Sequence, residues 1–479
     1  MPVLLWSDAL VFLLVAAVIV GAIHARHNDY LSRAWRRVAE SRFGMASLTL
    51  LAVFVAVGLL DSVHFRPKLD QAGTESGPAY SVEVLSVLDQ VLTPLRTRNE
   101  KTYSAPLAAH LYARETIDRP DGTQYRDYPR LKHGGAHLSD PQSERAADIA
   151  ARTLGGLGFG LAVWLACVAL ATLRVSRQSA GGALAAWRRI WRGETATAWN
   201  AVLLTLLAVL AIAGPIAALA GGYHVFGTDK VGQDVLYQAL KSIRTALLIG
   251  TLTTLVMLPF AILLGIVAGY LGGWVDDAIQ YLYTTLNSIP GVLLIAAAVL
   301  MMQVVIDGHP EWFSTAAERA DARLLALCLI LGITSWTGLC RLLRGETLKL
   351  RELEYVQAAQ AFGVSSARIM LRHLLPNVMH IVIIALVMDF SGLVLAEAVL
   401  SYVGIGVDPN TISFGTMINT ARMELSRDPI VWWSLAAAFA FMFVLVLAAN
   451  LFSDAVRDAF DPRFARRTRA RLALPGAAG

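Results

Sequence analysis

The feature that most constrains this chain is a series of nine apolar segments, each close to the length of a membrane-spanning helix. A helix needs roughly 20 apolar residues to cross about 30 Å of hydrocarbon. Only 16% of the 479 residues are charged, against about 25% in ordinary soluble domains. The sequence therefore predicts an all-α polytopic membrane protein. The segments lie at about 9–25, 45–63, 154–174, 199–221, 245–268, 289–306, 323–343, 378–400 and 431–452.

Arginines gather in four regions between or after these segments: 26–44, 174–198, 341–372 and 463–471. With nine spans all four regions fall on one side, which the positive-inside rule makes cytoplasmic. We therefore expect the N-terminus outside and the C-terminus in the cytoplasm. The net charge of +5 is explained by these loops and does not indicate a nucleic-acid partner. The first segment has no basic region before it and no clear cleavage site, so we interpret it as a retained anchor.

One long hydrophilic region, residues 66–152, falls outside in this topology. Turn signals such as Arg119-Pro120-Asp121-Gly122 suit either a small folded module or an extended cover. His110, His133 and His137 lie here, but their spacing fits no metal motif. The three cysteines, Cys167, Cys328 and Cys340, fall within or beside apolar segments and show no metal-ligand spacing. We expect neither a metal site nor a disulfide.

The loop between the seventh and eighth segments contains a short stretch suited to a docking helix, Glu354 to Phe362. Ala358 and Ala359 allow a close backbone approach, and Gly363 stands where a left-handed cap would end the helix. Pro376 and Asn377 are expected to break the helical conformation before the chain re-enters the membrane.

This spacing resembles the EAA loop of the peptide and nickel branch of binding-protein-dependent ABC importers. The matching positions are Glu354, Tyr355, Val356, Ala358, Ala359, Gly363, Ser365, Ile369, Arg372, His373, Leu375, Pro376 and Asn377. In that family the loop grips a cytoplasmic ATPase. The resemblance implies the same coupling role here for Glu354, Tyr355, Ala358, Ala359, Gly363, Arg372, His373 and Pro376.

A second motif follows the fourth segment and is similar to the family's H-x-x-G-T-D-x-x-G-R-D signature. Its residues here are Gly227, Thr228, Asp229, Gly232 and Asp234, with Gln233 in place of the arginine. Aspartates at these positions are suited to holding turns or capping a helix. We favour this structural role over direct contact with substrate.

Three further stretches resemble family elements. Gly269 to Asp276 is similar to G-Y-x-G-G-W-x-D, with Ser288-Ile289-Pro290 after it, and Asn450 to Arg463 is similar to the closing motif, with Ser453 replacing a glycine. Residues 400–409 are similar to L-S-F-L-G-L-G-V-x-P. The resemblance places Gly404, Gly406 and Pro409 of that stretch in an outer gate region.

The resemblance implies a six-helix type I importer core over residues 187–463. Residues 1–186 would be an extension with three more spans and the outer loop, and 464–479 a basic cytoplasmic tail. The implied partners are a second permease in a heterodimer, one or two ATPases that bind ATP and Mg, and an extracytoplasmic solute-binding protein. The location would be the bacterial inner membrane. Oligopeptide, dipeptide, peptide-antibiotic and nickel permeases share these motifs, and we choose peptides on their frequency in the family.

No Walker A sequence and no catalytic set occur in the chain, so we expect a transport subunit without its own ATPase site or cofactor. The alternative is an ion-coupled secondary transporter, which the scarcity of charges inside the spans disfavours. A membrane-bound enzyme acting through residues 66–152 is a third class. Asp389, Glu397 and His380 lie in or beside the eighth segment. They face either a pathway or a partner helix.

Overall fold

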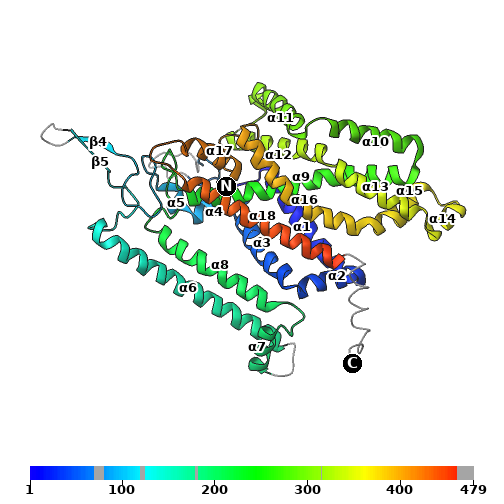
Figure 1. The fold of residues 1–479 in the computed structure, drawn as a ribbon, viewed down its shortest axis with the longest axis horizontal. Helices are drawn as coiled ribbons and strands as arrows, with labels where there is room; N and C mark the ends of the chain where they lie inside the picture. The colour runs from blue at the N-terminus through cyan, green and yellow to red at the C-terminus, as the bar shows by residue number, and fades with distance from the viewer. Residues whose placement is uncertain (69–79, 119–123, 178–181, 314, 461–479) are drawn as a thin grey trace, which may run out of the picture. The chain divides into compact units, whose positions relative to one another are not determined.

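The computed structural model describes residues 1–68, 80–118, 124–177, 182–313 and 315–460 (Figure 1). Within them, nine helical segments are long and apolar enough to cross a membrane. The predicted all-α polytopic fold is confirmed. These segments are Trp6–His27, Arg42–Asp61, Pro141–Arg177, Trp199–Ala220, Val235–Leu271, Gly291–Gly308, Ala316–Arg351, Ser366–Val403 and Trp433–Phe460.

The elements follow in chain order. They are β1 (Pro2–Val3), α1 (Trp6–His27), α2 (Asp29–Glu40), α3 (Arg42–Asp61), β2 (His64–Phe65), β3 (Leu85–Ser86), α4 (Val87–Val91), α5 (Thr93–Thr97), β4 (Glu115–Asp118), β5 (Gln124–Asp127), α6 (Pro141–Arg177), α7 (Gly182–Arg192), α8 (Trp199–Ala220), α9 (Val235–Leu271), α10 (Gly273–Ser288), α11 (Gly291–Gly308), η1 (Pro310–Trp312), α12 (Ala316–Ser335), α13 (Thr337–Arg351), α14 (Glu354–Ala361), α15 (Ser366–Ile369), the π-helical turn η2 (Met370–Leu374), α16 (Leu375–Val403), α17 (Phe414–Glu424) and α18 (Trp433–Phe460).

Helices α6 and α9 are among the spans that begin well before the apolar segments that predict them. Helix α6 begins at Pro141 rather than about residue 154, and α9 begins at Val235 rather than about 245. Hydropathy marks only the part of a helix that suits lipid, whereas backbone hydrogen bonding continues through polar turns. The hydrophilic residues 141–152 are therefore helical and belong to α6. The expected closing motif continues past Phe460 into residues 461–463, which lie outside the described part, as do the tail and the turn at 119–122.

The chain divides into two compact units, and the first comprises Met1–Ala9, Ala39–Ala246 and Pro409–Ala448. Within this unit α6 and α8 lie side by side (Figure 1). They approach closely because glycines face each other: a Cβ on Gly156 would stand 2.5 Å from the carbonyl oxygen of Gly214. Helix α3 packs on the same α8.

In the first unit, residues 85–118 and 124–140 form a folded module, which is one of the two forms expected from the sequence. Its strand β3 joins β1 and β2, which lie outside the module in sequence, in a small antiparallel sheet, and β4 pairs antiparallel with β5. Leu95 and Leu138 of the module are buried against Leu219 and Tyr223 at the end of α8. The module thus shares a hydrophobic core with the ends of the spans.

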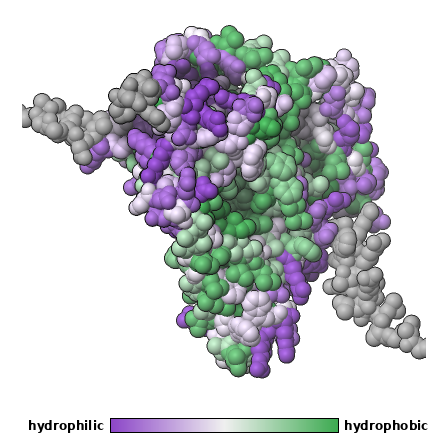
Figure 2. Space-filling view, turned by 60° about the vertical axis from the view of Figure 1, so that its left-hand side comes forward, coloured by the Kyte–Doolittle hydropathy of each residue, from purple (hydrophilic) through white to green (hydrophobic). Residues whose placement is uncertain are grey.

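The second unit comprises Leu10–Val38, Leu247–Asp408 and Ala449–Gly479. Its largest core gathers residues of α9, α13 and α16 with the short helices of the 354–374 region. Helix α2 packs through Ala34 and Val38 on the end of α18. Large hydrophobic side chains are exposed along many helices, and Figure 2 shows broad hydrophobic surface in green beside hydrophilic regions in purple. Such surface is what lipid-facing helices present.

Candidate functional site

One face of helix α14 packs on the hydrophobic core, and the opposite face is accessible. Val356 is completely buried, and Ala359 packs on the same core. At the edge of that face, Gln360 Nε2 donates to the hydroxyl of Tyr270 at 3.0 Å. Glu354 and Ala358 are exposed, and Phe362, directly after the helix, is 87% exposed. A short rigid helix with small and apolar groups on its open face is suited to docking another protein.

Gly363 ends this helix with a φ of +73°, and a Cβ at this position would meet nothing within 4 Å. The left-handed backbone, and not a lack of space, is what calls for glycine here. Tyr355 is fixed by Asn377, whose Nδ2 donates to its hydroxyl at 3.0 Å. His373 lies beside the same ring, with the ring centroids 6.2 Å apart.

The expected break at Pro376 is wrong. Helix α15, the turn η2 and α16 run as one helical segment from Ser366 to Val403. In η2 the N–H of Leu375 donates to the carbonyl of Met370, five residues back. Because Pro376 has no N–H and its ring clashes with the preceding turn of an α-helix, the wider π turn lets the helix continue through it.

An ion pair joins α13 to α10, two helices that share a hydrophobic core with α14. Arg344 of α13 donates two hydrogen bonds to Asp276 at the start of α10, Nε–Oδ1 at 2.5 Å and Nη2–Oδ2 at 2.6 Å. These bonds from Arg344 lower the pKa of Asp276. Gly269 of α9 packs against α13, where a Cβ would stand 2.7 Å from the carbonyl of Arg344. The aspartate belongs to a stretch that resembles a family motif, but no sequence pattern marks its partner 68 residues away.

The second motif, residues 224–234, is called the outer motif after the side of the membrane expected for it, and it builds a turn and a helix cap. Asp229 Oδ1 accepts from the N–H groups of Val231 and Gln233, both at 2.9 Å. Asp234 Oδ1 accepts from the N–H of Leu236 at 2.8 Å, in the first turn of α9. These contacts have the character that the sequence favoured for both aspartates.

The same motif also contacts the module of residues 85–118 and 124–140, which is called the outer module for the same reason. Thr228 Oγ1 accepts from the N–H of Ser104 at 2.7 Å, and Glu100 N–H donates to the carbonyl of Gly232 at 2.9 Å. A Cβ on Gly232 would stand 1.8 Å from the carbonyl oxygen of Glu100, and one on Gly227 would stand 2.4 Å from that of Ser104. The two glycines thus admit the backbone of residues 100–104 at contact distance.

Glu100 is the centre of this junction. Its carboxylate accepts hydrogen bonds from the backbone N–H groups of Lys132, His133 and Gly134 at 2.7–3.1 Å. Burial alone would raise its pKa, but His224 and these N–H groups outweigh burial and lower the pKa to about 2. No motif marks Glu100 in the sequence, because all its partners are brought together only by the fold.

His224 lies between two carboxylates. Its Nδ1 is 2.7 Å from Asp234 Oδ2, and its Nε2 is 3.4 Å from Glu100 Oε1. Burial lowers the pKa of a histidine, but here Asp234 and Glu100 prevail and raise it to about 9. The imidazolium is therefore the form that belongs to the folded junction at neutral pH.

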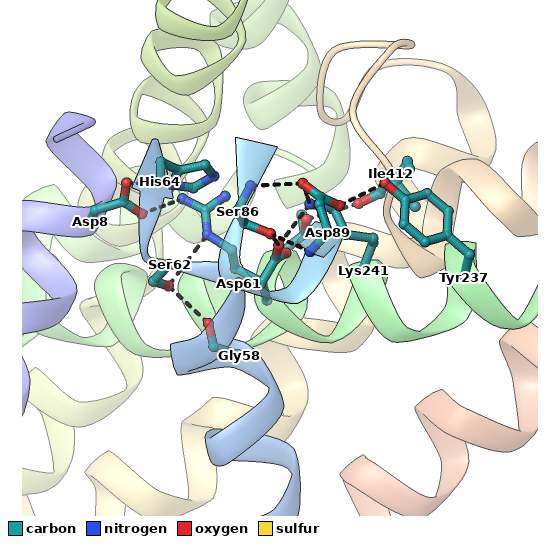
Figure 3. A network of polar contacts seen from close by, with 12 residues as sticks. Asp8, Gly58, Asp61, Ser62, His64, Ser86, Asp89, Tyr237, Lys241 and Ile412 are labelled. Carbon is teal, nitrogen blue, oxygen red and sulfur yellow. Dashed lines mark hydrogen bonds and ion pairs between the residues drawn. The ribbon is translucent and has the colours of Figure 1, made fainter. Parts of the chain in front are cut away.

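A second polar network joins the N-terminal spans to the start of α9 (Figure 3). Lys241 Nζ donates to Asp61 at 2.6 Å and to Asp89 at 3.1 Å, and Tyr237 donates to Asp89 at 2.8 Å. One turn on, Arg244 donates to Asp8 at 2.6 Å. Burial opposes the ionisation of Asp89, but Lys241 and its hydrogen bonds lower its pKa. Acidic residues of α1, α3 and α4 are thus fixed to two cations of α9.

The gate-region motif begins where α16 ends, at Gly404 in the left-handed conformation. Ser401 Oγ donates to Glu397 at 2.7 Å, and a Cβ on Gly406 would stand 1.9 Å from that hydroxyl. Arg323 of α12 forms ion pairs with both Asp307 at the end of α11 and Asp408 of the motif. The sequence did not single out this arginine.

Of the three ionisable residues in or beside the eighth segment, Asp389 lines a cavity. Glu397 is buried and bonded to Ser401. His380 Nδ1 lies 2.8 Å from the carbonyl of Asn377, in its own helix. Within the described residues no group of three or more histidine, cysteine, aspartate or glutamate side chains is placed to hold a metal ion.

The comparisons with known proteins agree on one class. The family described as "Binding-protein-dependent transport system inner membrane component" matches residues 261–466. The oligopeptide transport system permease protein OppC of Mycobacterium tuberculosis is 32% identical over 242 residues, covering 50% of this chain and 77% of that protein. The dipeptide transport system permease protein DppC of Bacillus subtilis is 28% identical over 306 residues, covering 61% and 89%.

A third relative, the glutathione transport system permease protein GsiD of Pectobacterium atrosepticum, is 29% identical over 298 residues, covering 58% of this chain and 90% of that protein. Among solved structures, the MetNI methionine ABC transporter is similar with a TM-score of 0.34 and 16% identity, covering 47% and 96%.

The class defined by the family match, the three permease relatives and the helical core is the membrane-embedded component of an ATP-driven importer. The chain belongs to the binding-protein-dependent transport system inner membrane component family, and it is a multi-pass permease subunit with the type I ABC importer fold. Members of this family generally function together with an ATPase, a further permease and a binding protein. The ion-coupled alternative receives no support.

Proposed function

We propose that this chain forms part of the translocation path for peptides and couples it to ATP hydrolysis through α14 and the loop that follows. Three relatives named for oligopeptides, dipeptides and glutathione support a peptide-like substrate. Nickel stays a distinct outcome of an uptake experiment, because the resemblance of the motifs alone did not separate nickel from peptides.

The observation that carries the coupling role is the asymmetric burial of α14. Val356 and Ala359 fix the helix to its core, while Glu354, Ala358 and Phe362 face outward. A partner that pulls on the open face therefore acts on the core of α9, α13 and α16. We infer that Tyr355, Gly363, Arg372, His373 and Pro376 shape this loop, as the family resemblance implies.

The assembly we propose contains a second, non-identical permease, one or two cytoplasmic ATPases that hold ATP and Mg, and an extracytoplasmic solute-binding protein. This chain supplies no ATPase site or cofactor of its own. We place the N-terminus and residues 85–140 outside and α14 in the cytoplasm, on the arginine distribution of the loops.

Co-purification of the detergent-solubilised complex tests the coupling role. In Ala358→Arg and Glu354→Arg we expect the recovered ATPase to fall roughly tenfold, equivalent to ~1.4 kcal/mol of binding free energy. Val231→Arg, at a position 62% exposed in the outer motif, is the matched control and should retain the ATPase. Full retention of ATPase by both loop variants, with the permease still monodisperse, would contradict the proposal.

Uptake into proteoliposomes tests the substrate. A radiolabelled tripeptide should accumulate only with ATP and the binding protein, and an uncoupler that collapses ion gradients should leave the rate unchanged. Accumulation of labelled nickel without peptide uptake would replace peptides by the metal ion as the substrate.

A further inference from the structure

Asp389 is an acidic residue in the middle of a membrane-spanning helix. It lies in the Ser366–Val403 segment, between the coupling loop at one end and Gly404 at the other. It lines a cavity of about 480 Å³, together with Ser335 and Gly338 beside the junction of α12 and α13, Met388 of α16 and Arg457 of α18. All of these residues belong to the second compact unit.

The carboxylate of Asp389 differs from the other acidic groups described above. Asp276 accepts two hydrogen bonds from Arg344, and Glu397 accepts one from Ser401. For Asp389 the described residues provide neither a hydrogen bond nor an ion pair. A carboxylate inside a span is costly unless something solvates or pairs it. The cavity that Asp389 lines is where a polar partner for this carboxylate can bind.

The cavity has the size and lining of a small-molecule site. Ligand sites typically measure roughly 300–1,000 Å³ and combine apolar walls with a few polar groups. Here Leu339, Leu342 and Ile381 provide apolar wall, while Asp389 and Arg457 provide one negative and one positive group. Opposite charges in one apolar cavity suit a zwitterion rather than a bare anion or an apolar molecule.

We propose that this cavity is a transit site for peptides in which Asp389 binds the free α-amino group of the passing molecule. Arg457 attracts its carboxyl end, and the apolar walls accept side chains without selecting among them. The inference rests on the proposed function, because it requires a peptide as substrate. It adds a residue of the permease itself that distinguishes free from blocked amino termini.

The test uses the complete transporter in nanodiscs and a photoreactive tripeptide, Ala-benzoylphenylalanine-Ala, with either a free or an N-acetylated amino terminus. After illumination, mass spectrometry measures the label on residues 335–342 and 378–389. Direct labelling avoids the selection that the solute-binding protein makes during delivery. Wild type, Asp389→Asn, Asp389→Glu and Met388→Leu are compared, the last as a control in the same cavity wall.

In wild type we expect the free-amine probe to label this cavity about tenfold more than the acetylated probe, as a charge-assisted hydrogen bond implies. The ratio should fall toward one in Asp389→Asn and stay near the wild-type value in Asp389→Glu and Met388→Leu. An unchanged ratio in Asp389→Asn overturns the proposal. If neither probe labels the transporter and unlabelled tripeptide is not taken up, the peptide function itself fails.

A salt-bridge gate between Asp389 and Arg457 is the competing explanation, and it makes a different prediction. Asp389→Asn would then reduce labelling by both probes equally, and the exchange Asp389→Arg with Arg457→Asp would restore it. That pattern also overturns the proposal. Because Asp389→Asn differs from wild type by one charge at constant volume, a monodisperse gel-filtration profile is enough to show that the variant is folded.

Discussion

His224 shows what a buried charge requires. Burial disfavours the charged imidazolium. This ring is charged because the carboxylates of Asp234 and Glu100 lie next to its two nitrogens. Asp234 is ten residues away in sequence and belongs to the same motif, whereas Glu100 comes from the outer module. One histidine thus links a family motif to a segment that the family resemblance does not cover.

The raised pKa of His224 predicts how this junction responds to alkali. Its folded pKa of about 9 lies above the ordinary 6.5, so its stabilising contribution is complete below pH 6.5 and is lost as pH rises through 9. The full contribution is about 3 kcal/mol. The difference in apparent Tm between wild type and His224→Gln should therefore shrink from pH 6.5 to 9.5. A constant difference would show that His224 is not held as a cation.

The pKa of Glu100 sets the lower limit of the pH range in which this junction is most stable. Its folded pKa of about 2 lies below the ordinary 4.5, so its contribution is present above pH 4.5 and is lost as pH falls toward 2. The junction should therefore be most stable between about pH 4.5 and 6.5. Thermal scans of wild type across this range would locate that maximum.

Gly363 allows backbone strain to be separated from crowding. With φ at +73° and no atom within 4 Å of a Cβ, a side chain costs only the left-handed conformation, about 1–2 kcal/mol for most residues and less for asparagine. Gly363→Asn should retain ATPase in co-purification, whereas Gly363→Val should lose several-fold more. Equal loss in both variants would mean that the ATPase contacts Gly363 itself.

The turn and cap contacts of Asp229 and Asp234 were foreseeable, because their partners are the N–H groups of residues two to four positions on. The partners of Asp276, Asp89 and Glu100 were not, since Arg344, Lys241 and His224 are 68, 152 and 124 residues away. A periodic pattern in one sequence reports local geometry and contains no information on which distant charges the fold brings together.

At the scale of elements, the hairpin of α6 and α8 offers a matched pair of substitutions. Gly156 faces the backbone of Gly214 at contact distance, while a Cβ on its neighbour Gly155 would meet nothing within 4 Å. Both substitutions by alanine improve helix propensity by up to about 1 kcal/mol. Only Gly156→Ala forces the helices apart, an overpacking cost of about 1–3 kcal/mol.

We therefore expect Gly156→Ala to lower the apparent Tm in detergent and to speed proteolysis of the 178–198 connection, with Gly155→Ala equal to wild type or slightly more stable. Equal behaviour of the two variants would contradict the close approach of α6 and α8.

Hydropathy predicted each span but not the true helix ends. It placed the start of α9 near residue 245 and so left Lys241 and Arg244 outside the helix, although both occupy its first turns and bind acidic partners. Hydropathy also could not predict η2. This π turn relieves the steric clash of the Pro376 ring with the preceding helical turn and involves no change in polarity.

At the scale of the whole molecule, the arginine distribution predicts sidedness. Val82 is 80% exposed in the N-terminal region and Phe362 is 87% exposed after α14. Each is replaced by cysteine in a background in which Cys167, Cys328 and Cys340 are alanine. A membrane-impermeant maleimide should label Val82→Cys in intact spheroplasts and Phe362→Cys only after permeabilisation. The reverse pattern would invert the topology.

The family resemblance predicted the class of the core because its motifs lie in short, contiguous stretches. It could not predict that the outer motif holds residues 100–104, since those residues carry no motif of their own. Membership in the family is confirmed by the comparisons. The assignment of individual coupling and gate residues stays a prediction that the experiments above address.

The uninterrupted helix through Pro376 has a mechanical consequence. At 1.5 Å per residue, the 38 residues from Ser366 to Val403 make a strut about 57 Å long, nearly twice the thickness of about 30 Å of hydrocarbon. A helix without a break transmits a displacement by tilting as a whole. A tilt of about 5° moves its far end by about 5 Å over that length. A force applied beside α14 would thus tilt the helix and displace Gly404 at its other end. Asp389, which lies between the two ends, would move by an intermediate distance.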